Sequence, residues 1–133
     1  MKKRGITLIE VLITIVIVAG LAAMAIPNFS KAMEKAAANQ AVAYLRTIAA
    51  AEKLYYAKNK TYFGGAGANA ATINAALGAE VSERNYTFSL TSTTTTFTAR
   101  ADKNSGSGAI SINESGSIQS PEALPAYVII PTD

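Results

Sequence analysis

One carboxylate, Glu10, lies inside an otherwise apolar stretch, and its chemistry most needs an explanation. Residues 6–26 read ITLIEVLITIVIVAGLAAMAI, and only Thr7, Glu10, Thr14 and Gly20 interrupt the apolar run. An ionisable side chain at the centre of a membrane costs about 2.5–3.5 kcal/mol on insertion scales and less near the surface, so it indicates a functional role by default. The alternative is that Glu10 lies near the lipid headgroups and reaches water there.

The chain offers little else for catalysis or metal binding. It has no cysteine and no histidine. The first absence excludes disulfides and thiolate metal sites. The second removes the commonest general base and the commonest metal ligand. We therefore expect no enzyme activity, no cofactor and no metal site.

The excess positive charge is confined to the N-terminus. The 133 residues carry 12 Lys and Arg against 9 Asp and Glu, for a formal net charge of +3, and Lys2, Lys3 and Arg4 supply the whole excess. A nucleic-acid-binding protein is expected to gather its basic residues on one face or helix of the folded domain. No nucleic-acid partner is therefore inferred.

The elements that must position Glu10 begin with a long helix. Residues 6–26 are long enough to span a bilayer, which takes about 20 residues, and the basic residues before them predict a cytoplasmic N-terminal end. Pro27 follows, and residues 28–60 are rich in Ala, Lys and Glu, which is typical of a helix. A single helix through Pro27 would be roughly 80 Å long. No compact domain of this size can bury it, so we expect its first half to lie in lipid or against other copies.

The second part of this helix is predicted to be amphipathic, because its apolar residues recur at steps of three, four or seven. We predict that its buried face consists of Phe29, Met33, Ala37, Ala41, Tyr44, Leu45, Ile48 and Tyr55. We predict that its solvated side consists mostly of Lys31, Glu34, Lys35, Arg46, Glu52, Lys53 and Lys58.

The composition changes after Phe63. Residues 64–85 predict a Gly- and Ala-rich connection with a short helical turn near 72–77. Alternating apolar and polar residues then predict three or four short antiparallel strands. These strands are expected over 86–91, 97–101, 109–113 and from Ile118, with Thr93–Thr96 in a strand or hairpin. The predicted fold class is α+β, a long N-terminal helix packed against a small antiparallel sheet.

Two further apolar groups are expected to complete the core. The aromatic cluster of Tyr55, Tyr56, Tyr62 and Phe63 is expected to pack between helix and sheet. The C-terminal tail contains the apolar run 127–130, and without a disulfide it must be held by packing alone. We therefore expect aspartate at Val128 or Ile129 to destabilise the domain.

The N-terminal segment resembles that of the type IV pilin and pseudopilin family. The resemblance rests on the basic leader, Gly5, the stretch Thr7-Leu8-Ile9-Glu10, the long apolar helix and Pro27. Glu10 follows Gly5 by five residues and Pro27 follows Glu10 by seventeen, as in the family. The resemblance is strong to about residue 30, continues through the amphipathic helix and is only general over the strands.

The resemblance implies a processing site and a division of the chain. A peptidase at the cytoplasmic side of the inner membrane would cut between Gly5 and Ile6, and Ile6 would then be methylated, although the family usually has Phe there. Glu10 would become the fifth residue of the mature chain. The implied parts are a leader (1–5), a transmembrane and filament-core segment (6–27) and a globular head (28–133). The head comprises the helix 28–60, a loop 61–85, and the sheet and tail 86–133.

Cleavage would place a cationic amine on Ile6, about one helical turn from Glu10. A buried ion pair is favourable only with good geometry. In a stack of staggered helices, Glu10 of one subunit could neutralise the Ile6 amine of its neighbour, and an unpaired charge would penalise wrong registers. Gly20 and Pro27 mark a weak stretch of the helix, because proline removes a backbone hydrogen bond. In the family's filaments this region can lose helical order.

The resemblance implies a structural subunit of a type IV pilus. It would cross the inner membrane once before assembly and then form a homo-oligomeric filament at the cell surface. Its implied partners are the prepilin peptidase and the assembly platform and motor proteins. A role in adhesion, motility or DNA uptake is not selected by these residues.

Three alternatives stay open. The first is the major pseudopilin of a type II secretion system, in a periplasmic pseudopilus. The chain lacks the Tyr-Pro pair after the helix and the clustered C-terminal acids of that group, which favours a pilus. The pattern Ala23-Met24-Ala25 could also end a secretory signal peptide and release a binding module beginning at Ile26. An uncleaved anchor would leave a membrane-tethered binding module.

Overall fold

The computed structural model describes residues 5–122 and 124–130. The residues Lys2, Lys3 and Arg4 of the expected leader and the last residues of the tail, 131–133, lie outside the described residues. The chain divides into two compact units, 1–34 and 35–133. One helix, α1 (Leu8–Asn59), contributes to both units.

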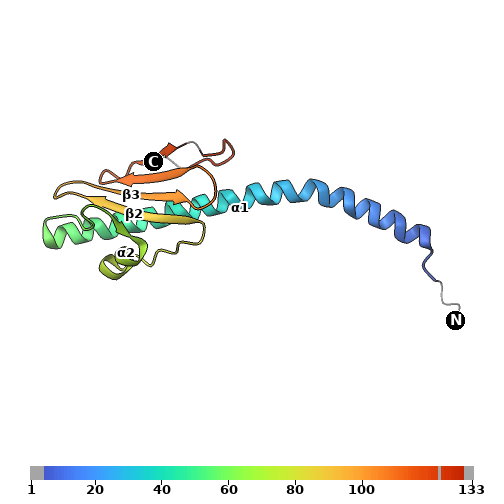
Figure 1. The fold of residues 1–133 in the computed structure, drawn as a ribbon, viewed down its shortest axis with the longest axis horizontal. Coiled ribbons are helices and arrows are strands. Elements are labelled where there is room, and N and C mark those ends of the chain that lie inside the picture. Colours follow the sequence, from blue (N-terminus) through green and yellow to red (C-terminus); the bar gives the residue numbers. More distant parts are fainter. Residues whose placement is uncertain (1–4, 123, 131–133) are drawn as a thin grey trace. The chain divides into compact units, whose positions relative to one another are not determined.

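The first unit is helical from Leu8 onward, and no described side chain in it is buried. Helix α1 continues through Pro27 without a break (Figure 1). This agrees with the prediction of one helix from the apolar segment into the amphipathic one.

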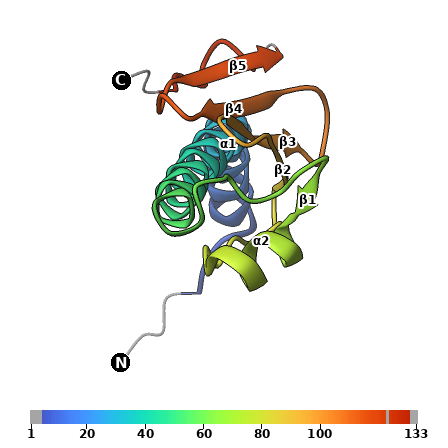
Figure 2. The ribbon, with the colours of Figure 1, turned by 90° about the vertical axis from the view of Figure 1, so that its left-hand side faces the viewer.

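The second unit packs a five-stranded antiparallel sheet against its part of α1, which confirms the α+β prediction (Figure 2). The strands follow one another in chain order, and each is paired with the next. Their bounds are β1 (Ala68–Asn69), β2 (Tyr86–Ser92), β3 (Phe97–Lys103), β4 (Ala109–Asn113) and β5 (Ile118–Glu122). Four of these strands were predicted. Strand β1 was not, because two residues are too few to show an alternation of apolar and polar side chains.

A short helix, α2 (Ala70–Leu77), confirms the turn predicted near 72–77. The side chain of Asn69 caps its start by accepting a hydrogen bond from the Thr72 N–H at 3.0 Å. Gly78 ends the helix in the left-handed conformation with φ 65°, where a glycine avoids the strain of a side chain.

The core lies between α1 and the inner face of the sheet, and the alternation of the strands explains it. Tyr86, Phe88 and Leu90 of β2 are buried, while the intervening residues are exposed or half-buried. On the central strand β3, Ala99 and Ala101 are small and completely buried.

The predicted helix face was partly wrong. Ala41, Leu45 and Ile48 are buried, and Ala37, Tyr44 and Tyr55 are half-buried. Phe29 and Met33, however, are 68% and 56% exposed. They belong to the first unit, and periodicity identifies an apolar face without showing what covers it. The other buried residues of α1, which the prediction missed, are Ala38, Val42, Ala49 and Glu52.

The two expected groups of apolar side chains behave differently. The aromatic cluster is confirmed, with ring centroids 5.6 Å apart for Tyr55 and Phe63 and 4.6 Å for Tyr56 and Tyr62. Tyr62 also contacts Phe97 of β3, with ring centroids 5.0 Å apart. In the tail, Val128 packs against the core, but Ile129 is 72% exposed. The expected destabilisation by aspartate at Ile129 is therefore withdrawn.

Candidate functional site

The candidate site begins where the chain enters α1. Gly5 and Ile6 precede the helix, and Ile6 is 77% exposed. Thr7 caps the first turn: its carbonyl accepts the N–H of Glu10 at 3.1 Å, and its Oγ1 accepts the same N–H at 3.4 Å. The bond between Gly5 and Ile6 therefore lies in exposed, non-helical chain, which suits a peptidase. The structure does not test cleavage, which stays a prediction.

Glu10 is exposed on the first turn of α1. A carboxylate near a helix N-terminus is favoured by the helix dipole. Within the described part of the chain, no ion pair joins Glu10 to another residue, and Ile6 lies outside the helix. The predicted pairing with the Ile6 amine involves a second copy, so it stays a prediction.

Glu10 is surrounded by an apolar surface that nothing in the described chain covers. Each large apolar side chain that the structure describes in the first unit is at least 45% exposed. They are Ile6, Leu8, Ile9, Val11, Leu12, Ile13, Ile15, Val16, Ile17, Val18, Leu21, Met24, Ile26, Phe29 and Met33. By length and composition α1 could cross a membrane. A continuous, exposed apolar surface of this kind indicates that the helix lies in lipid or in an interface with another molecule.

The predicted weak stretch is helical here. Pro27 has no N–H to donate to the carbonyl one turn earlier. One residue on, the Asn28 side chain donates to the Met24 carbonyl at 3.3 Å. No heavy atom outside the local helix would lie within 4 Å of a Cβ at Gly20. Whether the helix loosens between Gly20 and Pro27 in an assembly stays a prediction.

A second uncovered face, which the sequence analysis missed, lies on α1 within the second unit. Seven exposed, uncharged residues follow one another at alternating steps of four and three. They are Ala36, Gln40, Ala43, Thr47, Ala50, Leu54 and Ala57. This spacing is the heptad pattern by which helices pack against one another. We call it the outer seam of α1. This spacing is present in the sequence, but only one packed face of the helix was predicted from it.

Glu52 was predicted on the solvated side, and this prediction was wrong: its side chain is 0% exposed. Its Oε2 accepts a hydrogen bond from the Phe63 N–H at 3.0 Å, while Oε1 has no partner among the described residues. Burial raises the pKa of the carboxyl, and the hydrogen bond from Phe63 opposes this rise only in part. Residue type alone suggested solvent, because a glutamate is almost never fully buried without a partner.

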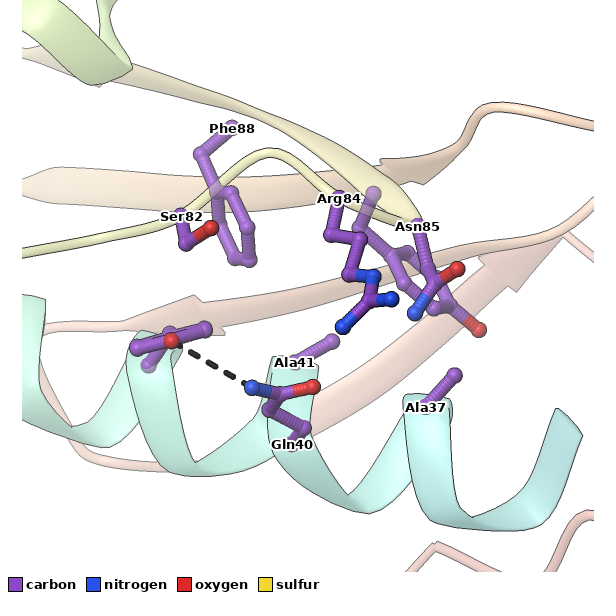
Figure 3. A pocket seen from close by; sticks show the side chains of 9 residues that line it. Ala37, Gln40, Ala41, Ser82, Arg84, Asn85 and Phe88 are labelled. Carbon is purple, nitrogen blue, oxygen red and sulfur yellow. Dashed lines mark hydrogen bonds between the residues drawn. The ribbon is translucent and has the colours of Figure 1, made fainter. Parts of the chain in front are cut away.

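The second unit also has a small surface depression between α1 and the segment that precedes β2 (Figure 3). It has a cavity volume of only about 10 Å³ and is lined by Ala37, Gln40, Ala41, Tyr44, Ser82, Arg84, Asn85, Tyr86 and Phe88. Figure 3 shows Arg84 and Asn85 reaching toward α1, where the Gln40 amide donates to the Tyr44 hydroxyl at 3.3 Å. Small-molecule sites usually enclose about 300–1,000 Å³, so this depression is too small for such a ligand. Among the described residues, no three carboxylates come together to hold a metal ion.

Comparison with known proteins identifies the family. Residues 27–111 match the family model of the type IV minor pilin ComP, DNA uptake sequence receptor. Residues 1–26 match the model of the prokaryotic N-terminal methylation motif. Together the two matches include the exposed N-terminal part of α1 and most of the second unit.

Two characterised proteins are similar to this chain. The type IV wide pilus major component PilA4 of Thermus thermophilus is 37% identical over 91 residues, 68% of this chain and 66% of that protein. The type IV major pilin protein PilA of Myxococcus xanthus is 36% identical over 61 residues, 46% of this chain and 28% of that protein. The chain thus spans just under two thirds of the first relative and under a third of the second. With an apolar N-terminal helix, an antiparallel sheet and these matches, the chain belongs to the type IV pilin family.

Proposed function

We propose that this chain is a structural subunit of a type IV pilus that polymerises through residues 6–26 after cleavage between Gly5 and Ile6. The observation that carries the proposal is the uncovered surface of α1. No described side chain of the first unit is buried, and the residues of the outer seam of α1 are exposed and uncharged. The match of residues 1–26 to the methylation motif supports cleavage and methylation at Ile6.

The same proposal divides the chain and places it in the cell. Residues 1–5 form the leader, 6–27 the transmembrane and filament-core segment, and 28–133 the head. The precursor crosses the inner membrane once, and the prepilin peptidase removes the leader. The assembly platform and motor proteins then add the subunit to a surface filament. Its role is structural and not catalytic.

The intact mass of the protein purified from its native cells tests the processing step. A mature chain beginning at Ile6, one methyl group heavier than its sequence, supports the proposal. A chain beginning at Ile26 would establish a secreted module, and an uncut chain would establish a tether. Electron microscopy of sheared surface fractions then distinguishes a long pilus from a periplasmic pseudopilus.

The outer seam provides a sharper test of polymerisation. Ala43→Glu places a charge in the seam, whereas Ala75→Glu places the same charge on an exposed position of α2. Both positions are exposed in the single chain, so both variants should fold. We expect Ala43→Glu to abolish sheared filaments and Ala75→Glu to leave their yield unchanged. Equal filament yields would contradict a packing role for the seam.

DNA contact is a second candidate function, favoured by the family match to a DNA uptake sequence receptor and by a basic row on α1. Lys35, Arg46 and Lys53 are exposed and recur at steps of eleven and seven, on one side of the helix. Fluorescence anisotropy with labelled duplex DNA at about 50 and about 200 mM salt tests it, because contact through three basic residues should weaken steeply over this range. It should also weaken when Lys35 and Lys53 are both replaced by Gln, and salt-independent binding would contradict it.

A further inference from the structure

Glu52 occupies a position that suits a neutral carboxyl better than a carboxylate. Its side chain is completely buried on the face of α1 that packs against the sheet. Oε2 accepts the Phe63 N–H at 3.0 Å, as the carbonyl oxygen of a protonated acid would, and Oε1 meets no donor among the described residues. An ionised form would leave charge on a buried oxygen without a hydrogen bond, which is costly.

The described surroundings supply no compensating cation. The titratable side chains of this region are Tyr62, Tyr56 of α1 and Glu114 of the turn between β4 and β5, and Tyr56, Glu114 and Glu52 each help to raise the pKa of Tyr62, after its burial. None of these side chains can carry a positive charge. Phe97 of β3, in ring contact with Tyr62, carries no charge. Lys53 is exposed, and no ion pair joins it to Glu52 within the described residues. Negative charge on Glu52 is therefore opposed by burial and is compensated by no cation among the described residues.

The hydrogen bond from Phe63 makes this carboxyl part of a junction. Phe63 follows the end of α1 and stacks edge-on against Tyr55, and the adjacent Tyr62 stacks on Tyr56. Lys60 leaves the helix with φ 60°, so the chain turns back at once toward α1. Within this junction, the Glu52 side chain ties α1 directly to the backbone of residues 61–63.

We propose that Glu52 is a pH-sensitive latch, which fastens residues 61–63 to α1 while its carboxyl is protonated and loosens this junction when it ionises. The inference concerns the second unit by itself and goes beyond assembly of a filament. The direction of the effect follows from linkage. A carboxyl with a folded-state pKa above its unfolded value stabilises the fold fully below the unfolded pKa, and this contribution is lost as the pH rises through the folded pKa.

The test compares thermal unfolding of the full chain in detergent micelles from acid to mildly alkaline pH, followed by the near-ultraviolet signal of its tyrosines. We expect the melting temperature of the wild type to fall between the unfolded pKa of Glu52, near 4.5, and its raised folded value. Glu52→Gln keeps an acceptor for Phe63 and should remove this part of the pH dependence. Glu114→Gln is the matched control and should keep it.

A pH dependence of Glu52→Gln as large as that of the wild type would overturn the proposal. A direct measurement protects the test against a variant that fails to fold. The carbon-13 shift of the Glu52 carboxyl in the wild type should titrate above 4.5, with amide exchange at Phe63 accelerating over the same pH range beyond its intrinsic rate. Titration at or below 4.5, or exchange at Phe63 that ignores this titration, would equally overturn it.

Discussion

The side-chain amide of Asn74 makes two hydrogen bonds with the backbone of Val81. Asn74 Nδ2 donates to the Val81 carbonyl at 2.9 Å, and the Val81 N–H donates to Asn74 Oδ1 at 2.7 Å. Val81 is 6% exposed, so few other partners can reach these groups. The amide thus replaces a strand partner for a segment that pairs with no described strand, and it joins α2 to the chain leading into β2.

Replacing Asn74 by Ala should therefore destabilise the second unit. It leaves a buried N–H and a buried C=O of Val81 without partners, at about 1–3 kcal/mol for each unsatisfied group. Urea unfolding in detergent, followed by near-ultraviolet circular dichroism, measures the change. Asn59→Ala is the control, because the Asn59 amide donates to the Tyr55 carbonyl at an exposed helix end. The control should change stability by less than about 0.5 kcal/mol. Equal losses would show that Asn74 contributes nothing special.

Gly64 should not tolerate a side chain. A Cβ there would lie 3.1 Å from Leu90 Cγ and 3.2 Å from the Leu90 carbonyl oxygen, and its φ of 120° is unfavourable for any L-residue. We expect Gly64→Ala to cost on the order of 1–3 kcal/mol of unfolding free energy.

Gly65→Ala is the control for Gly64. Gly65 has φ 54°, and nothing lies within 4 Å of its Cβ position. It should lose only the cost of the left-handed conformation, about 1–2 kcal/mol. If the two variants lose the same free energy, the contact with Leu90 is unimportant.

The sequence was most informative where one local pattern determined the structure. The alternation of Tyr86, Phe88 and Leu90 predicted both the strand β2 and its buried face, because side chains in a strand alternate between faces. Similarly, the apolar length of residues 6–26 predicted a helix that the rest of the described chain leaves uncovered.

Predictions failed where the outcome depended on tertiary contacts. Charge placed Glu52 in solvent, but its position on the helix face that meets the sheet buries it. The spacing of four between Phe29 and Met33 does place both on one apolar face of the helix, but burial was wrongly predicted, because both side chains are exposed. The role of Asn74 was also invisible, because its partner is the backbone of Val81, which any sequence supplies.

An aspartate in the C-terminal tail should destabilise the domain at Val128 but not at Ile129. Val128 is half-buried against the core, and its N–H donates to the Pro125 carbonyl at 2.8 Å, whereas Ile129 is 72% exposed. Val128→Asp should cost about 1–3 kcal/mol, because it removes an apolar contact and draws a carboxylate out of water. Ile129→Asp should change the unfolding free energy by less than about 0.5 kcal/mol. The reverse order in a urea titration would mean that the tail packs by its other face.

Glu10→Ala should separate processing from assembly. The exposed chain at Gly5 and Ile6 is unchanged by this substitution, so we expect normal membrane insertion and a mature N-terminus at Ile6. If the carboxylate of one subunit neutralises the Ile6 amine of the next, its loss leaves that amine buried and unpaired. Breaking a buried pair in this way costs about 3–5 kcal/mol, which weakens subunit association by more than about a hundredfold. Intact mass and the yield of sheared filaments measure the two steps separately. Val11→Ala, which truncates the adjacent exposed side chain and keeps the charge, should reduce the yield far less. A normal filament yield from Glu10→Ala would show that assembly does not need the charge pair.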